Sequence, residues 1–295
     1  MKINRHCARL SLLTIGLTLS VPGTGGFIIA SAIAAPVIAL APGTTSPAAA
    51  PITKTFPNTC YSNASPGDSI NTFGGFKVSS NIWNSGAATA YRQCTSATIQ
   101  SPGGVVSAEF DWNFTSTNSD VKTYPNIQFG QQGANRPSTT PLLPVAIAAM
   151  PDLTATGAIT TTCATAVPCY FDSGFDVFFS STAKPKNLIE GELMIITSYN
   201  FVQPLGGWVA TNVSIGGGTF NVRHFQMKSG GRSWPYVAYY ATSPITQIHM
   251  NIKDFVTDAV QKDYIPASYY VDMIEIGTEA LSGHGITKIT NYNIQ

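Results

Sequence analysis

The chain has 295 residues, a formal net charge of +1 and only 11% charged residues, so it is long enough for one substantial hydrophobic core. It contains no run of Lys or Arg, which argues against nucleic-acid partners and against electrostatic binding to membranes. A charged fraction far below the usual figure of about 25% is typical of a secreted β-protein whose surface relies on hydroxyl and amide groups. We therefore expect uncharged partners.

The first 35 residues have the pattern of an export signal. Lys2, Arg5 and Arg9 precede an apolar stretch over residues 10–21, and a small-residue cleavage site follows at residues 32–34. Gly and Pro interrupt the stretch before it reaches the roughly 20 residues that a spanning helix needs. We expect cleavage, a secreted product and no stable membrane association, with a retained signal anchor as the alternative. Removal of the segment leaves 13 basic and 15 acidic residues, a net charge of −2.

The next segment, residues 36–57, consists mainly of Ala, Pro, Thr and Ser. This composition predicts a disordered or extended linker. The remaining residues, 58–295, show no internal repeat and no sign of a second domain, and we expect them to form a single folded domain.

Cleavage would leave an even number of cysteines, which in an exported protein indicates disulfides. The most economical pairing joins Cys60 to Cys94 and Cys163 to Cys169, although four cysteines allow three pairings. A zinc site is the rival interpretation. It is disfavoured because no Cys-x-x-Cys pair occurs and the histidines are scattered, so we expect no metal and no cofactor.

From Cys60 onward, Gly, Pro, Asn and Ser divide the chain into short runs that favour strands, for example 75–79, 105–110, 174–179 and 218–222. The spacing predicts one helix, over residues 254–264, with Asp254 as its cap and Pro266 as its stop. Many strands with one helix near the C-terminus predict an all-β fold, a jelly-roll sandwich of two antiparallel sheets.

Two isolated carboxylates lie on alternating apolar strands. In residues 191–197, Glu192, Met194 and Ile196 share one strand face, and Glu279 ends a second such run before glycine. An ionised carboxylate that is buried unpaired costs several kcal/mol, so a Glu retained there either faces solvent or belongs to a site that uses it. A pair of such residues favours a glycosidase, because glycoside hydrolysis requires two carboxyl groups across the scissile bond.

Short motifs in a fixed order strengthen this interpretation. They are Asn81-Ile82-Trp83, Tyr124-Pro125-Asn126, Phe175-Asp176-Val177-Phe178, Glu192-Leu193-Met194-Ile195, Gln203-Pro204-Leu205-Gly206 and Gly277-Thr278-Glu279. No single motif is specific, but together, over about residues 58–295, they resemble the glycoside hydrolase family 12 endoglucanases.

This resemblance implies a jelly roll with an open cleft on its concave sheet and a retaining endo-β-1,4-glucanase of the cellulase type. It assigns Glu192 as nucleophile and Glu279 as acid/base. Asp176 should neighbour the nucleophile and share a proton with it, since two close carboxyls do not both ionise. A structural, hydrogen-bonded Asp176 is the alternative. Asp272 and Glu275 carry no distinguishing mark, and we interpret both as structural.

Aromatic side chains cover the flat faces of sugar rings while polar neighbours bond the hydroxyl groups. By resemblance, Asn81 and Trp83 bind the substrate on the non-reducing side of the cut, and Met194 lines the floor. Tyr124 is a further candidate, and Trp208 is a candidate of lower weight, as are Trp112 and Trp234. For each Trp, a core position is the alternative.

Position 196 departs from the family pattern, because Ile196 stands where Trp is usual. We expect a missing stacking surface there, with consequences for substrate choice. The expected partner is a β-glucan polysaccharide acted on by a monomer. Two alternatives are a xyloglucan-specific endoglucanase and a non-catalytic carbohydrate-binding or wall-loosening sandwich.

Overall fold

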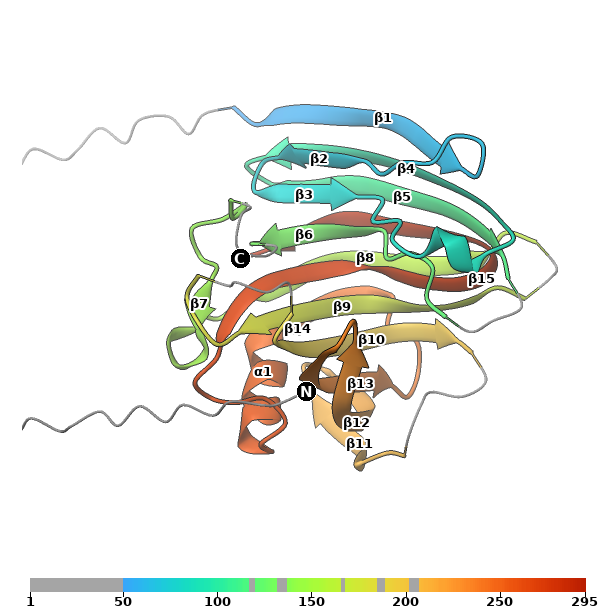
Figure 1. The fold of residues 1–295 in the computed structure, drawn as a ribbon. Coiled ribbons are helices and arrows are strands. Elements are labelled where there is room, and N and C mark those ends of the chain that lie inside the picture. Colours follow the sequence, from blue (N-terminus) through green and yellow to red (C-terminus); the bar gives the residue numbers. More distant parts are fainter. Residues whose placement is uncertain (1–49, 117–119, 132–136, 166–167, 185–188, 202–206) are drawn as a thin grey trace, which may run out of the picture. The chain divides into compact units, whose positions relative to one another are not determined.

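Two β-sheets share one long strand in the computed structural model, which describes residues 50–116, 120–131, 137–165, 168–184, 189–201 and 207–295 (Figure 1). Sheet A has the strand order β1-β4-β5-β15-β8-β14, and sheet B the order β2-β3-β6-β15-β9-β10-β13-β12-β11. The expected export signal and most of the expected linker lie outside the described residues.

The strands of sheet A are β1 (Ile52–Ser62), β4 (Ala90–Ser101), β5 (Gly104–Thr115), β8 (Thr154–Cys163) and β14 (Gln247–Asn251). Sheet B contains β2 (Ile70–Phe73), β3 (Phe76–Ser79), β6 (Asn126–Gly130), β9 (Tyr170–Ser180), β10 (Gly191–Asn200), β11 (Ala210–Ile215), β12 (Gly218–Ser229) and β13 (Arg232–Ala241), with the short β7 (Val145–Ala146) beside β15 (Tyr270–Ile294). Single 3₁₀ turns occur at Ser85–Ala87 and Ile147–Ala149.

The all-β jelly-roll class is confirmed, with one departure from the expected antiparallel pairing. β10 and β13 run parallel, so sheet B is mixed. β15 joins the two sheets. Its first half pairs with β6 and β9 in sheet B, and its second half, from Gly283 onward, pairs with β5 and β8 in sheet A.

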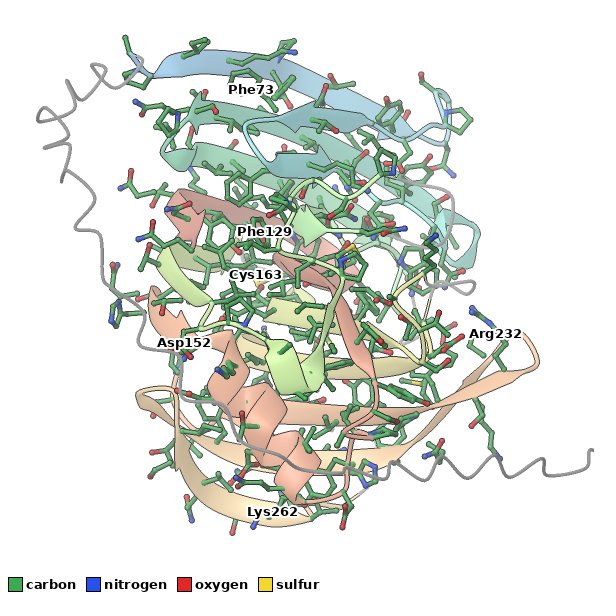
Figure 2. All side chains as sticks on the ribbon, turned by 90° about the vertical axis from the view of Figure 1, so that its left-hand side faces the viewer. Phe73, Phe129, Asp152, Cys163, Arg232 and Lys262 are labelled. Carbon is green, nitrogen blue, oxygen red and sulfur yellow. A yellow bond between two sulfur atoms is a disulfide. The ribbon has the colours of Figure 1, made fainter. Side chains whose placement is uncertain are left out.

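The core lies between the sheets because each strand alternates. On β10, Leu193 and Ile195 are fully buried in the main hydrophobic cluster, which also includes Phe110 and Ile289 from sheet A. Phe129 of β6 belongs to the same cluster and lies among the side chains at the centre of Figure 2.

The helix α1 (Ile252–Gln261) covers the core side of β12 and β13. Phe255 packs edge-to-face on Phe220 and Tyr239 with centroid distances of 5.3 Å each. The helix begins two residues before the predicted start, and its cap is Asn251, whose side chain accepts a hydrogen bond from the Lys253 N–H. Asp254 instead occupies the first turn, and Lys262, labelled in Figure 2, follows the last turn.

The boundary predicted at residue 58 is too late. β1 starts at Ile52, and Phe56 is only 8% exposed within the core cluster, so residues 52–57 belong to sheet A. Local composition concealed this strand because its partner, β4, is distant in sequence.

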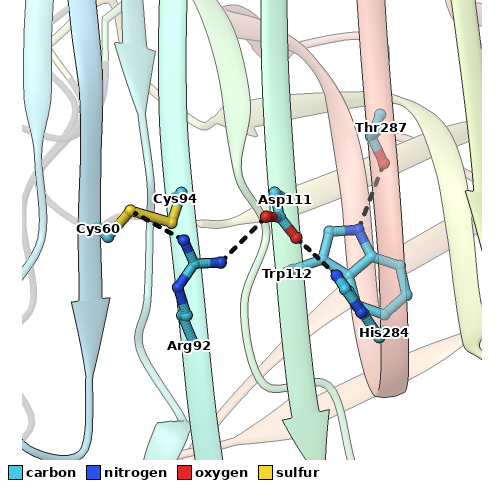
Figure 3. Close-up of polar contacts among 7 residues, drawn as sticks. All are labelled: Cys60, Arg92, Cys94, Asp111, Trp112, His284 and Thr287. Atoms are coloured by element: carbon cyan, nitrogen blue, oxygen red, sulfur yellow. Dashed lines mark hydrogen bonds and ion pairs between the residues drawn. A yellow bond between two sulfur atoms is a disulfide. The ribbon is translucent and has the colours of Figure 1, made fainter. Parts of the chain in front are cut away.

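Both predicted disulfides are present, Cys60–Cys94 and Cys163–Cys169. The first joins residues that are directly opposite on β1 and β4. Figure 3 shows how polar contacts continue across sheet A: Arg92 approaches the Cys60 sulfur and pairs with Asp111 at 3.0 Å, and Asp111 contacts His284 of β15 at 2.8 Å. Four neighbouring strands are thereby linked.

Candidate active site

The face of sheet B that points away from the core carries the polar residues of interest, and we call it the site face. On β10, Glu192, Met194 and Ile196 occupy this face, while Leu193 and Ile195 enter the core, as the alternation predicted. The edge-strand, solvent-exposed alternative for Glu192 is wrong, because β10 lies between β9 and β13 and Glu192 is 8% exposed.

Glu192 has one polar partner on the neighbouring strand. The Trp234 indole N–H donates a hydrogen bond of 2.7 Å to Glu192 Oε2. Burial raises the pKa of Glu192 to about 8, the Trp234 hydrogen bond lowers it, and the charge of Glu279 raises it further. Trp234 therefore favours the ionised form of a carboxyl that burial would otherwise keep neutral.

A second carboxyl lies beside Glu192. Asp176 on β9 is opposite Met194 of β10 on one side and opposite Glu275 of β15 on the other. Asp176 is 4% exposed, and its Oδ1 has no hydrogen-bond partner. Burial and then the charge of Glu192 raise its pKa well above the usual range. Burial and the neighbouring charge therefore favour the protonated form of Asp176.

Glu275 on β15 is also buried, directly opposite Asp176. Its Oε2 accepts a hydrogen bond of 3.1 Å from Asn126 Nδ2, and its Oε1 has no partner among the described residues. Burial raises its pKa to about 8 despite the nearby charge of Lys77. Asp272, by contrast, accepts a hydrogen bond from Ser180 at 2.8 Å at the start of β15, in agreement with the structural interpretation.

Glu279 lies at the other end of the site face, directly opposite Asp172 of β9. Burial, the charge of Asp172 and a hydrogen bond to Asp172 all raise the pKa of Glu279 well above the usual range. The same hydrogen bond lowers the pKa of Asp172, which burial raises to about 7. The proton of this pair therefore resides on Glu279, and Asp172 accepts from it.

The two predicted carboxyls lie within electrostatic reach of each other. The charge of Glu279 raises the pKa of Glu192, and the charge of Glu192 raises that of Asp172. The hydrogen bond from Trp234 favours the ionised form of Glu192, whereas burial and Asp172 favour the protonated form of Glu279. This arrangement pairs one group able to act as a base or nucleophile with one able to donate a proton.

The strand that carries Glu279 is supported from behind by buried hydroxyl groups. Thr278 contacts Ser173 and Thr287 at 2.7 Å each, and Thr161 contacts both of these residues at 2.7 and 2.9 Å. A satisfied network between the sheets fixes the position of β15 next to β9.

The residues predicted to bind substrate beside β3 lie in a loop. β3 ends at Ser79, Asn81 adopts a left-handed φ of 42°, and Ile82 makes only an isolated bridge to Thr123, so Asn81 and Trp83 do not share the face of a regular strand. Trp83 is 60% exposed, which excludes a core position.

Tyr124 lies closer to the carboxyls. Its backbone N–H donates to Asn81 O, and its hydroxyl donates to Gly174 O at 3.3 Å. After burial, the charges of Asp176, Glu275 and Glu279 raise its pKa. Tyr124 is therefore at the site although only 5% exposed.

The opposite side of the site face carries an aromatic group centred on Tyr240. Tyr199, Phe201 and Trp208 each meet its ring at a steep angle, with centroid distances of 5.5, 6.4 and 5.4 Å. Trp208 is 38% exposed, whereas Trp112 is fully buried. The motif at residues 203–206 lies outside the described residues.

Met194 accepts a hydrogen bond from the Tyr236 hydroxyl at 3.0 Å and is buried on the floor of the site face. Ile196 is opposite Tyr240 and is 1% exposed within the same cluster. Aromatic neighbours therefore cover this side chain, and its consequence for substrate choice stays a prediction.

Sequence reasoning missed Asp172, and it gave little weight to Trp234 and Glu275. A signal was present for two of them, because residues an even number apart on a strand share a face. Asp172 is four residues before Asp176, and Glu275 is four residues before Glu279. Trp234 carried no comparable signal because its role depends on the β10–β13 pairing.

Other features of the described residues add no further chemistry to this face. They contain no group of three or more His, Cys, Asp or Glu side chains arranged for a metal ion. No helix within the described ranges is long and apolar enough to cross a membrane. An open hollow of about 390 Å³ lies on sheet A instead, lined by residues that include Thr55, Ser96 and Lys288.

Comparison with known proteins agrees with the fold. The chain is 27% identical over 215 residues to the inactive glycoside hydrolase XLP1 of Phytophthora nicotianae, covering 71% of this chain and 81% of the relative. It is 23% identical to endoglucanase S of Pectobacterium parmentieri, and the alignment covers 72% of this chain and 79% of the relative. The native family 12 xyloglucanase from Bacillus licheniformis superposes with a TM-score of 0.68 at 21% identity, covering 78% of this chain and 99% of that structure.

The family model for glycosyl hydrolase family 12 matches residues 74–295, which include every carboxyl of the site face. The chain therefore belongs to glycosyl hydrolase family 12.

Proposed function

We propose that this protein hydrolyses internal β-1,4-glucosidic bonds in cellulose-type glucans by a retaining double displacement. The observation that carries the proposal is the opposed environment of two carboxyls on one sheet face: Glu192 accepts a hydrogen bond from Trp234, and Glu279 is paired with Asp172. The first arrangement favours a carboxylate and the second a carboxylic acid.

In the first step, Glu192 attacks the anomeric carbon and forms a covalent glycosyl-enzyme. Glu279 protonates the departing glycosidic oxygen, so the leaving sugar departs as a neutral alcohol. In the second step, Glu279 removes a proton from water, which attacks the same carbon and releases Glu192. Two inversions give net retention.

Asp176 assists by keeping its proton while Glu192 ionises, so that the charge on Glu192 is not opposed by a second carboxylate.

Asn81, Trp83 and Tyr124 bind the sugar on the non-reducing side, Met194 lines the floor, and Trp208 offers a stacking surface on the other side. The exposure of Trp83 and Trp208 supports these roles.

We further propose that the protein is exported and acts as a monomer. The two disulfides support export, because such bonds persist in oxidising compartments. Xyloglucan is the second candidate substrate, since a xyloglucanase is among the proteins with the same fold. A non-catalytic role is the second candidate function, favoured by the inactive hydrolase among the relatives.

The test is reducing-sugar release by the secreted full chain from soluble β-glucan and from xyloglucan. Glu192→Gln and Glu279→Gln should each abolish turnover while the melting temperature changes little, because the replacements conserve shape. Glu109→Gln, on the outer part of sheet A and paired with Lys288, is the matched control and should retain activity. A wild-type chain that binds glucan without releasing sugar would establish the non-catalytic alternative.

Azide distinguishes the two roles. With an aryl cellobioside, Glu279→Ala should give the β-azide, because azide replaces water at the glycosyl-enzyme. Glu192→Ala should give the inverted α-product, because azide then attacks directly. Identical products from both variants would contradict the assignment of roles.

A further inference from the structure

Arg223 is a buried cation on the site face that the proposed mechanism does not use. It lies on β12 opposite Ala238, which is opposite Met194 of β10, so it shares a row with the floor of the site. The side chain is 4% exposed, and its Nε and Nη1 atoms have no hydrogen-bond partner among the described residues. Burying a guanidinium with unused donors is unfavourable, so an acceptor is required from elsewhere.

Aromatic rings provide part of the compensation. The guanidinium carbon lies 4.3 Å from the ring centroid of Trp208 and 5.7 Å from that of Tyr240. Such contacts stabilise the charge through the flat face of the guanidinium. They leave the N–H groups of Nε and Nη1, which point outward in its plane, without acceptors.

The location of Arg223 relative to Glu279 defines which sugar could supply those acceptors. Tyr240 is near both: its ring lies 5.7 Å from the Arg223 guanidinium, and its pKa, raised mainly by burial, is raised further by the charges of Asp172 and Glu279 and lowered by that of Arg223. Tyr199, which packs on Tyr240, is directly opposite Asp172. Arg223 is thus on the β12 side of the carboxyls, whereas Trp83 follows β3 on the other side.

The first chemical step requires the leaving sugar to lie beside the residue that protonates its oxygen. If Trp83 holds the non-reducing side, the leaving sugar extends across β10 and β13 toward β12. There it meets the exposed face of Trp208 and the unused donors of Arg223. Hydroxyl oxygens of a neutral sugar fit these donors, and a nearby group of carboxyls disfavours an anionic one.

We propose that Arg223, stacked on Trp208, donates hydrogen bonds to the hydroxyl groups of the leaving sugar and is the specificity-determining residue of the reducing-side subsite. This inference rests on the proposed function. It extends that function by making turnover depend on the sugar beyond the scissile bond.

The test compares two substrates that match on the non-reducing side and differ on the leaving side. Cellopentaose places sugar hydroxyls at the Arg223 subsite, whereas an aryl cellobioside places none there. Arg223→Gln should lower kcat/KM for cellopentaose by about 10-fold or more, the loss expected for hydrogen bonds from a charged donor. The ratio of the two kcat/KM values should therefore fall by a similar factor.

Arg92→Gln removes an arginine from the outer part of sheet A and is the matched control, with no expected change in the ratio. Arg223→Lys keeps the charge but loses the planar fork, and it should lower the ratio by an intermediate factor. If Arg223→Gln does not fold, the ratio measured for Arg223→Lys provides the test instead.

If the ratio of the two kcat/KM values is unchanged in the Arg223 variants, even when both values fall by the same factor, the inference is overturned and Arg223 is a structural residue. Absence of activity in the wild-type chain on both substrates is a different result, since it would refute the proposed function itself. A lowered ratio with retained aryl-cellobioside turnover supports both.

Discussion

Trp234 Nε1 lies 2.7 Å from Glu192 Oε2, across the parallel pairing of β13 with β10. Because this hydrogen bond lowers the pKa of Glu192, Trp234→Phe should raise that pKa further. The acid limb of the pH profile of kcat/KM should move to higher pH, and kcat/KM near neutral pH should fall by about 10-fold, as for the loss of a hydrogen bond to a charged group.

Trp112→Phe is the matched control for this prediction. It removes a fully buried indole whose N–H points to Thr287 at 3.4 Å, away from Glu192. It should lower the melting temperature without moving the acid limb. Equal pH profiles in the Trp234 variant and the wild type would show that the bond does not control the ionisation of Glu192.

Glu275 gives a prediction about stability and pH. Burial raises its pKa from an ordinary 4.5 to about 8 in the folded chain, so the folded state binds the proton more tightly than the unfolded state does. The contribution of this group to stability is complete below about pH 4.5 and is lost as the pH rises through about 8. Each pKa unit of difference corresponds to about 1.4 kcal/mol. We therefore expect the free energy of unfolding to fall between about pH 5 and pH 9.

Glu275→Gln stays neutral at every pH and should make this fall less steep. Part of the slope should persist, since the pKa values of Glu192, Asp176 and Glu279 are raised in the same direction. Denaturant unfolding at several pH values measures the slope, with the partly exposed Glu109→Gln as control. If the free energy of unfolding falls with pH equally steeply in the wild type and in Glu275→Gln, the prediction is contradicted.

The two disulfides should contribute unequally to stability. Cys60 and Cys94 are separated by 34 residues, and Cys163 and Cys169 by 6. In the chain-entropy description, the longer loop restricts the unfolded chain more, by about 4 kcal/mol against about 2 kcal/mol. Urea unfolding of the two paired Cys→Ser variants should show the larger loss for Cys60 and Cys94. A reversed order would mean that strain or residual unfolded structure outweighs loop length.

Ile196→Trp should destabilise the protein without strengthening glucan binding. Ile196 is 1% exposed beneath the aromatic group around Tyr240, so a larger side chain has to displace its neighbours. Overpacking of this kind costs about 1–3 kcal/mol. Ile70→Trp, on β2 at a position that is 47% exposed, is the matched control and should be nearly neutral. Tighter binding of cello-oligosaccharides by the Ile196 variant would indicate that the site face opens there.

Local patterns were sufficient for the features that depend on one strand at a time. Alternation on β10 placed Glu192 and Met194 on one face and Leu193 on the other, and cysteine spacing predicted both disulfides. The order of short motifs was sufficient for the family.

Features that depend on register between distant strands could not be predicted in this way. The register of β10 shifts against β9 between Ile196 and Ser198, opposite Gly174, where an added Cβ would lie 2.0 Å from Ile195 O. This irregularity brings Tyr199 opposite Asp172. The parallel pairing that brings Trp234 to Glu192, and the burial of Arg223, likewise arise from contacts across the sheet.

The long shared strand also bears on the order in which the molecule assembles. Without β15, sheet A separates into β1-β4-β5 and β8-β14, sheet B separates into β2-β3-β6 and β9-β10-β13-β12-β11, and β7 has no partner. Ribosomes make β15 after every strand with which it pairs. An emerging chain therefore keeps open sheet edges and lacks Glu279 until β15, a strand of 25 residues, has been made. The two sheets, and with them the pairing of β9 with β15 that places Asp172 opposite Glu279, can be completed only at the end of synthesis.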